Sequence, residues 1–437
     1  MKRMVRGLVI AWYYPPGNSS EGIVTYKLLK NSSCEYDVFT RLNPQENIWD
    51  RKIVEKEMKS NNVTIYERDA RDKNKWISEA VRFFEENRDK YDFLMTRSMG
   101  VEPHEAGLII KEKHPEVKWI ASFGDPLVDS PYIETLSKRD NPFFAKEVIR
   151  KQRISKKKWP YILLSPTRNI RRMAWERERR IKMKGVERLA EINDSVFANA
   201  DEIILNNDYQ LEHAMARKDF KKYEDKCIVL RHSYDETLYS NKSKKSDDKK
   251  IKFSYVGHLD DLRNARALLK GISHLKKNNP GISDRVEFSF YGHLSERDKA
   301  YIIDEDITDL IKVHKDISYL ESLDVIKQSD WSILIDANLN DKLEKYIYLP
   351  AKTADYFGAK AKIFCITQRC GATYDAMKNV NAGVIVSHSA DEIYLYLSKI
   401  ILKGYSPVRY NEKERLKYDA RSVAKEFDDM VKVLTKK

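Results

Sequence analysis

A turn in the second half of the chain carries residues that could hold a diphosphate. Between Phe253 and Ile272 an apolar strand ends at Gly257, a helix is predicted to begin near Asn264, and Arg263 lies in the turn between them. A helix N-terminus offers unpaired N–H groups and the positive end of the helix dipole, and a guanidinium adds a fork-shaped cation. Such a turn could bind a diphosphate and stabilise it as a leaving group. An ordinary strand–turn–helix with a solvated arginine is the alternative.

A second segment, Tyr348–Thr367, offers a lysine and a carboxylate on one side of a short helix. Pro350 precedes this helix, and Lys352 and Asp355 are spaced three residues apart, which places them on one face. A carboxylate at a ligand site can accept both hydroxyls of a ribose, and the lysine could reach a phosphate. The alternative is a surface ion pair between these two residues, which would contribute little to stability.

The first half of the chain carries candidates for the acceptor side. Asp125 follows a predicted strand in the run Phe-Gly-Asp-Pro, and His104 ends the run Arg-Ser-Met-Gly-Val-Glu-Pro-His after another. We expect Asp125 to orient or deprotonate an acceptor hydroxyl, a task that suits a carboxylate whose pKa is raised by burial; a helix-capping aspartate is the alternative. His104 is a weaker acceptor-side candidate, because a residue at a helix start explains it as well. Gly22 could let the backbone approach the phosphate or sugar of a donor, or simply end a loop.

The elements that must position these residues form two alternating series of strands and helices. Such alternation predicts parallel sheets covered by helices, and therefore an α/β protein with two doubly wound, Rossmann-like domains facing a central cleft. We expect an N-terminal domain over residues 1–238, a polar linker over 239–250, a C-terminal domain over 251–408, and a closing helix within 409–437 that returns to the N-domain. The strands are predicted at Arg6–Ala11, Tyr36–Thr40, Asn62–Tyr66, Asp92–Thr96, Lys118–Ser122, Glu202–Leu205, Cys227–Leu230, Lys252–Val256, Val286–Tyr291, Ile311–Val313, Trp331–Ile335, Lys362–Cys365 and Gly383–Val386. The closing helix is predicted from about Glu412 to Leu434.

The positive charge of the chain is concentrated in one segment. The formal net charge is +13, and between Lys146 and Arg188 there are 16 Lys or Arg against 4 Glu, a net charge of +12. Aromatic and apolar residues are interleaved with these cations, as on a surface that lies on an anionic membrane. We therefore predict a basic helical insertion at about 136–190 that binds the membrane through 143–188. Nucleic acid is the rival partner, without a recognisable module, and a solvated insertion is the third interpretation.

Composition limits the other classes of protein. No stretch has the ~20 apolar residues of a membrane span, and the apolar start of the chain runs into Tyr-Tyr-Pro-Pro without a cleavage site, so it is better explained as a first strand. The four cysteines have neither metal-ligand spacing nor a disulfide pattern. We expect a cytoplasmic protein, peripheral on the inner face of the cell membrane, with no metal.

The motifs above resemble those of one enzyme family. The turn Gly257-His258-Leu259-x-x-x-Arg263-Asn264 is similar to the Gly-Arg-Leu-x-x-x-Lys-Gly turn of retaining glycosyltransferases of the GT-B fold, of the group 1, family-four type. Pro350-x-Lys352-x-x-Asp355-Tyr resembles the Pro-x-Lys-x-x-Glu-Tyr segment of its polysaccharide-building members. Further similarities lie at Trp-Tyr-Tyr-Pro-Pro-Gly with Gly22, at Ala-Asp-Glu-Ile-Ile (200–204) and at Arg-His-Ser-Tyr-Asp (231–235).

The resemblance implies roles for these residues. Arg263 replaces the lysine that binds the diphosphate, with His258 and Lys352 assisting and Gly257 and Asn264 completing the donor turn. Asp355 replaces the glutamate that binds the ribose. The implied reaction moves a sugar from a nucleoside-diphosphate sugar to a hydroxyl of a lipid-linked or cell-surface glycan acceptor, with retention and without a cofactor.

The sequence departs from the family pattern at several positions. His258 stands where the family often has arginine, Ile347 where many members have a second glutamate, and Gly124 where a histidine often precedes the aspartate. These departures support one alternative, a catalytically silent subunit that scaffolds a partner transferase. A sugar-nucleotide epimerase on the same fold is the other.

Overall fold

The computed structural model describes residues 3–17, 19–42, 59–98, 100–128, 130, 187–240, 250–260, 262–339 and 343–436. The compact unit that holds both sheets comprises residues 1–125 and 199–437. Residues 126–198 form a second unit, in which 187–198 are helical. Most of the predicted basic insertion at 136–190, including nearly all of the predicted membrane-binding segment 143–188, and most of the predicted linker at 239–250 lie outside the described residues, so these predictions are untested.

The first sheet has, within the described residues, seven parallel strands in the order β3-β2-β1-β4-β5-β6-β7. Its strands are β1 (Arg6–Ala11), β2 (Glu35–Leu42), β3 (Val63–Asp69), β4 (Phe93–Ser98), β5 (Trp119–Phe123), β6 (Glu202–Leu205) and β7 (Cys227–Val229). The helices that follow them include α1 (Ser20–Asn31), α3 (Lys73–Asn87), α4 (Glu102–Lys113) and α9 (Asp208–Met215). The chain starts mid-sheet at β1 and reverses direction between β3 and β4, so the carboxyl ends of β1 and β4 lie at the point where ligands bind in such sheets.

The second sheet repeats this topology with six described parallel strands in the order β10-β9-β8-β11-β12-β13. Its strands are β8 (Ile251–Val256), β9 (Val286–Tyr291), β10 (Ile311–His314), β11 (Trp331–Ile335), β12 (Ile363–Ile366) and β13 (Gly383–Val386). Its helices are α10 (Arg266–Asn278), α11 (Glu296–Asp304), α12 (Tyr319–Gln328), α13 (Lys352–Gly358), α14 (Ala372–Val380) and α15 (Ala390–Lys403). In this sheet the strand order reverses between β8 and β11. The candidate donor-site residues lie after β8 and within α13.

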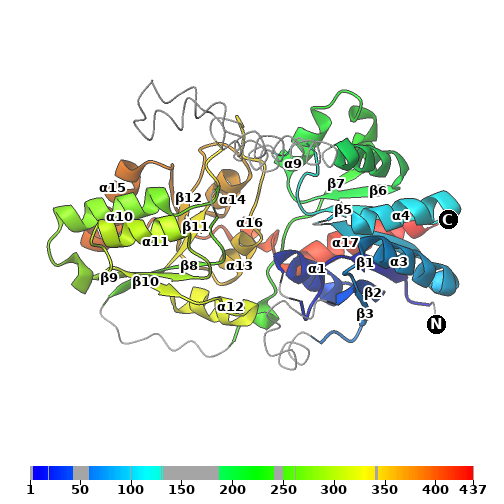
Figure 1. The fold of residues 1–437 in the computed structure, drawn as a ribbon, viewed down its shortest axis with the longest axis horizontal. Coiled ribbons are helices and arrows are strands. Elements are labelled where there is room, and N and C mark those ends of the chain that lie inside the picture. Colours follow the sequence, from blue (N-terminus) through cyan, green and yellow to red (C-terminus); the bar gives the residue numbers. More distant parts are fainter. Residues whose placement is uncertain are drawn as a thin grey trace, which may run out of the picture. The chain divides into compact units, whose positions relative to one another are not determined.

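Two apolar clusters cover the faces of the second sheet. One contains residues of α10, α11 and α15, and the other contains residues of α12, α13 and α14. Figure 1 shows α10 and α15 next to each other on one face. A sheet buried on both faces needs continuous apolar strands rather than alternating ones, as in the Trp-Ser-Ile-Leu-Ile run of β11. The predicted fold class is confirmed.

The closing helix returns to the first domain, but it is interrupted. The sequence predicts one helix from Glu412 to Leu434, whereas the structure has α16 (Glu412–Leu416) and α17 (Ala420–Thr435). The break has a physical cause: the side chain of Asp419 caps α17 by accepting from the N–H of Arg421. Figure 1 shows α17 beside α1, and Phe427 and Val431 of α17 are part of the apolar core of the first domain.

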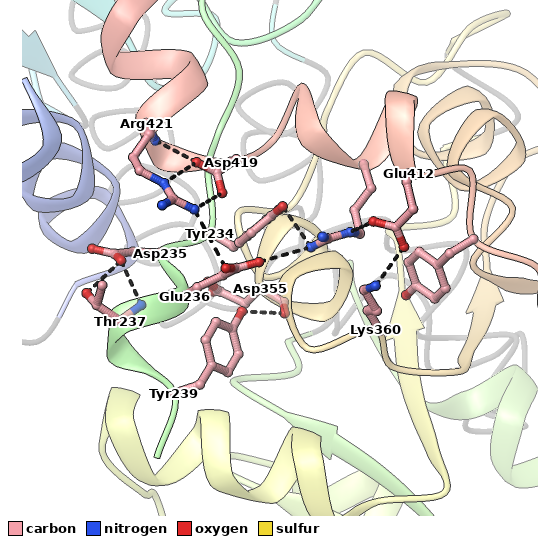
Figure 2. Close-up of polar contacts among 12 residues, drawn as sticks. Tyr234, Asp235, Glu236, Thr237, Tyr239, Asp355, Lys360, Glu412, Asp419 and Arg421 are labelled. Atoms are coloured by element: carbon pink, nitrogen blue, oxygen red, sulfur yellow. Dashed lines mark hydrogen bonds and ion pairs between the residues drawn. The ribbon is translucent and has the colours of Figure 1, made fainter. Parts of the chain in front are cut away.

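The chain crosses between the two domains twice, and the two crossings are bonded to each other. Tyr234 in the outgoing crossing donates its N–H to the carbonyl of Tyr418 (2.8 Å) in the returning one, and the N–H of Ala420 donates back to the carbonyl of Tyr234 (2.8 Å). Arg415 donates to the hydroxyl of Tyr234 (2.7 Å). Figure 2 shows this group, with Asp419 holding Arg421 on one side and Glu412 holding Lys360 on the other.

Candidate functional site

The carboxyl end of β8 is shaped by Gly257. Its φ of +118° is in a region that side chains rarely adopt, and a Cβ at this position would lie 2.6 Å from the Nζ of Lys352. Glycine is therefore required twice, by the backbone conformation and by the lysine that crosses the strand end. The structure brings these two predicted donor-site residues together.

Lys352, at the first turn of α13, is held by neutral partners. Its Nζ donates to the carbonyl oxygen of Val256 (2.5 Å) and to the hydroxyl of Tyr255 (3.3 Å), and it lies over the Tyr255 ring. Among the described ion pairs none includes Lys352. Burial and, after it, the nearby charge of Arg263 lower the pKa of Lys352 to about 7, although the carboxylates of Asp336 and Asp355 oppose this. These nearby acids therefore offset the cost of burying the ammonium only in part.

Arg263 lies in the turn before α10 rather than at its first residue. The side chain of Asp260 fixes this turn by accepting from the N–H groups of Leu262 (2.6 Å) and Arg263 (2.7 Å). The guanidinium is close enough to Lys352, to Asp336 and to Asp125 to shift the pKa of each. Arg263 therefore lies between the two predicted halves of the site, since Asp125 follows β5 of the first sheet.

Two other residues of the predicted donor turn have partners of their own. Asn264 lies before α10, which begins at Arg266 and not at Asn264 as predicted, and its Oδ1 accepts from the N–H of Arg266 (3.2 Å). This contact spans two residues and belongs to the turn before the helix, whose N-cap is Ala265. The His258 side chain is 70% exposed and bonds through Nε2 to Asp316 (2.8 Å) after β10. No described contact joins His258 to Arg263 or Lys352.

The carboxylate of Asp355 points to the first domain. Its Oδ1 accepts from Lys27 of α1 (2.9 Å) and from the hydroxyl of Tyr319 (2.8 Å). The ion pair considered from the sequence, between Lys352 and Asp355, is not the one that forms. Asp355 nevertheless lies close enough to Lys352 to raise its pKa.

Asp336 was missed in the sequence, although a signal was present. It follows the uninterrupted apolar strand β11 directly, at the edge where ligands bind. The residue is fully buried, and its Oδ2 accepts from Thr367 (2.6 Å). Burial raises the pKa of Asp336 to about 6, and the neighbouring cations Arg263 and Lys352 oppose this rise.

The first domain contributes a buried ion pair and an exposed acid. Arg97 of β4 pairs with Glu21 of α1 (2.6 Å) and donates to the hydroxyl of Ser122 (2.7 Å). Asp125 is exposed, and yet its pKa is raised to about 6, by the surrounding protein and by the charge of Glu21, against opposing effects of Arg263 and Arg97. An accessible side chain crowded by protein is typical of a concave surface. Glu21 and Arg97 were not found in the sequence, because nothing local links residues of α1 and β4.

Gly22 and His104 have different surroundings from those predicted. Gly22 is inside α1, not in a loop, and a Cβ there would lie 3.2 Å from the backbone of Tyr14, so it allows this helix to pack on the preceding segment. His104 is fully buried, bonds Thr96 through Nδ1 (2.7 Å) and packs against Phe123. Burial lowers its pKa to about 3. Its burial does not agree with contact to an acceptor, and it supports the helix-start interpretation.

Two residues that depart from the family pattern, Ile347 and Gly124, accept hydrogen bonds through their backbone carbonyls. Ile347 is buried, and its carbonyl accepts from the side chain of Asn207 (3.0 Å) of the first domain. The carbonyl of Gly124 accepts from Asn206.

In the described residues no group of three or more His, Cys, Asp or Glu could hold a metal ion, and no helix is long and apolar enough to cross a membrane.

Comparison with solved structures identifies the architecture. Sucrose-phosphate synthase from Thermosynechococcus elongatus superposes with a TM-score of 0.65 at 12% identity, covering 98% of this chain and 99% of that one. The chain has the GT-B fold. A glycosyltransferase from Rickettsia africae matches this GT-B chain with a TM-score of 0.62 at 10% identity over 100% of both chains. A UDP-N-acetylglucosamine 2-epimerase matches it with a TM-score of 0.53 at 11% identity, over 97% of this chain and 94% of that one. No protein-family model and no curated protein matches the sequence of this GT-B chain.

Proposed function

We propose that this GT-B chain is a retaining glycosyltransferase that moves a sugar from a nucleoside-diphosphate sugar to an acceptor hydroxyl. One observation carries the proposal: Arg263 and Lys352 lie together at the carboxyl edge of the second sheet, and Arg263 also lies near Asp125 of the first. The similarity to a sucrose-phosphate synthase and to a glycosyltransferase supports the same reaction class.

The two cations fit a diphosphate. Lys352 beside Arg263 would gain from further negative charge, because burial and the like charge of Arg263 lower its pKa in spite of the nearby Asp336 and Asp355. A pyrophosphate would supply this further negative charge. As the bond from the sugar C1 to the diphosphate oxygen breaks, negative charge grows on that oxygen, and preorganised cations stabilise this change more than they stabilise the ground state.

Asp125 is the proposed acceptor-side residue. The acceptor oxygen bonds to C1 on the face that the diphosphate leaves, and the hydroxyl proton is accepted or oriented by the Asp125 carboxylate. A pKa of about 6 leaves this carboxylate mostly ionised at neutral pH and still basic enough to accept a proton. In this proposal Arg263 and Lys352 take the role that a metal has elsewhere, so turnover in excess chelator should equal turnover without it.

The acceptor is proposed to be a lipid-linked or cell-surface glycan precursor. The 16 cations between Lys146 and Arg188 support this idea, since each cation near an anionic surface contributes ~1 kcal/mol of binding. Replacement of the Lys and Arg residues at 150–158 by Glu should abolish flotation of the chain with anionic liposomes. Unchanged flotation would remove the argument for a membrane-borne acceptor and for a location on the inner face of the membrane.

A thermal-shift panel of nucleotide sugars tests the function. A donor at ~100 times its Kd should add ~2.7 kcal/mol to the free energy of unfolding. Nucleotide release that requires an added lipid acceptor supports transfer. Turnover without any acceptor would indicate an epimerase, which the structural similarity to such an enzyme makes a specific alternative. Binding without turnover would indicate a catalytically silent subunit.

A further inference from the structure

Lys27 is an unusual residue in the middle of α1, because its side chain is only 1% exposed. A buried ammonium requires a partner, and the Nζ of Lys27 donates to Oδ1 of Asp355, 2.9 Å away in the other domain. The residues are 328 positions apart in the chain. This ion pair reaches the carboxylate to which the family resemblance gives the role of binding the ribose of the donor.

The bonds on Asp355 are distributed unequally between its two oxygens. Oδ1 accepts from Lys27 and from the Tyr319 hydroxyl, and the Tyr239 hydroxyl donates to the backbone carbonyl of Asp355 (2.7 Å; Figure 2). None of the hydrogen bonds among the described residues uses Oδ2. A carboxylate has lone pairs for about four hydrogen bonds, so Oδ2 remains able to accept from a ligand while Oδ1 is fixed.

The position of Asp355 is suitable for a ribose beside a bound diphosphate. Lys352 and Asp355 are one helical turn apart on α13, and the carboxylate lies close enough to Lys352 to affect it electrostatically. In a nucleoside diphosphate the ribose is joined directly to the first phosphate. A diphosphate on Lys352 and Arg263 therefore brings the ribose hydroxyls near this turn of the helix.

We infer that Lys27 is a positioning residue for the nucleotide: by holding Oδ1 of Asp355 from the first domain, it orients the carboxylate so that Oδ2 accepts the ribose 2′-hydroxyl. The inference rests on the proposed function and deepens it, since ribose recognition then depends on both domains. The alternative is that the Lys27–Asp355 pair only joins the domains.

The experiment measures discrimination between ribose and deoxyribose. Uridine, guanosine and adenosine diphosphates and their 2′-deoxy counterparts are titrated against the full chain by calorimetry. The unchanged chain should prefer the ribonucleotide that it binds by about tenfold or more, as expected for a hydrogen bond to a charged group. Lys27→Met should reduce this preference to about twofold or less, because the unconstrained carboxylate no longer meets the hydroxyl.

Lys30→Met is the matched control. Lys30 is on the same helix and also forms an ion pair across to another segment, with Asp235 (2.8 Å), but it does not contact Asp355. This variant should keep the full preference. If Lys27 had only a structural role, Lys27→Met would weaken the binding of ribo- and deoxyribonucleotides equally and leave the ratio of their affinities unchanged. That result would overturn the inference while the proposed function stands.

The remaining outcomes are also decisive. If the unchanged chain binds ribo- and deoxyribonucleoside diphosphates equally well, Asp355 does not bind the ribose 2′-hydroxyl. The inference then fails, and the proposed function stands. If the unchanged chain binds none of them, the proposed function fails as well. If Lys27→Met does not fold, Lys27→Gln takes its place, because this polar side chain is one atom shorter and no longer reaches Oδ1 of Asp355. A fully retained preference in that variant overturns the inference.

Discussion

The carboxyl edges of the two sheets have the same topology and opposite charge. The edge of the first sheet has acids, with Glu21 paired to Arg97 and Asp125 left exposed beside them. The edge of the second has cations, with Lys352 and Arg263 held near each other. In the first the pKa of an acid is raised, and in the second the pKa of a lysine is lowered.

Each shift moves its group towards the neutral form, which indicates that both edges lack part of their charge balance in the ligand-free chain. In the proposed reaction the diphosphate of the donor would supply negative charge at the cationic edge, and the acceptor hydroxyl would supply a proton to the acid at the other edge. This difference explains how two similar sheets can have different tasks, one for the leaving group and one for the acceptor. The same sheet order therefore says little about chemistry.

The largest expected effect comes from removing the cation that lies between the two edges. Arg263→Ala should lower the rate of acceptor-dependent nucleotide release by about 10² to 10³-fold, as for loss of one preorganised donor to a developing charge, and it should abolish the thermal shift with nucleotide sugars. Arg266→Ala is the control, since this neighbouring arginine pairs with Asp298 instead. Equal effects of the two substitutions would remove Arg263 from the site.

Substitution of the acid should affect transfer and spare donor binding. Asp125→Asn is expected to slow acceptor-dependent release by about 10²-fold, the lower range for a general base, while the nucleotide thermal shift stays unchanged. Asp72→Asn tests the alternative that Asp125 is only a helix cap, because Asp72 caps α3 through the N–H of Lys75. A loss of stability in Asp125→Asn similar to that in Asp72→Asn, with transfer retained, would favour the capping role.

The two pKa shifts predict a narrow pH profile. The reaction needs Asp125 ionised, so kcat/KM should rise through pH about 6, and it needs Lys352 protonated, so it should fall above pH about 7. Diphosphate affinity should weaken about tenfold per pH unit on that falling limb, because binding must then include uptake of a proton. In Lys352→Met the falling limb should disappear, together with the proton uptake seen by calorimetry in buffers of different ionisation enthalpy. If the falling limb of the pH profile persists in Lys352→Met, the titration of another residue causes it.

The smallest expected effect concerns the glycine below Lys352. Gly257→Ala should lower the free energy of unfolding by ~1–3 kcal/mol, because alanine is strained at positive φ, and it should also weaken diphosphate binding several-fold by displacing the Lys352 ammonium. Gly281→Ala separates the two effects, since Gly281 has a φ of +75° with open space around it. That control should lose stability and keep its affinity. Equal affinities in the two variants would show that Lys352 tolerates displacement.

The sequence predicted the sheets far better than the contacts between them. Strands such as Trp331–Ile335 have the predicted bounds because a strand buried along its whole length is rich in apolar residues. The break at Asp419 was missed although an aspartate that can cap a helix is a local signal; the pairing of this segment with Tyr234 is far away in the chain and could not be seen. For the same reason no local pattern indicated that Lys27 takes the carboxylate of Asp355, or that His104 is inside the core. Asp336 is different: an acid directly after a buried strand was visible and could have been included.

The bonded pair of crossings has a mechanical consequence. Tyr234 exchanges two backbone hydrogen bonds with the returning chain, so the two connections between the lobes behave as one short ribbon rather than as two independent tethers. Sliding one lobe past the other would have to break both bonds, whereas swivelling about the ribbon leaves them intact. A rotation about this ribbon would instead have to break other contacts between the lobes, such as the Lys27–Asp355 ion pair and the hydrogen bond from Asn207 to the carbonyl of Ile347.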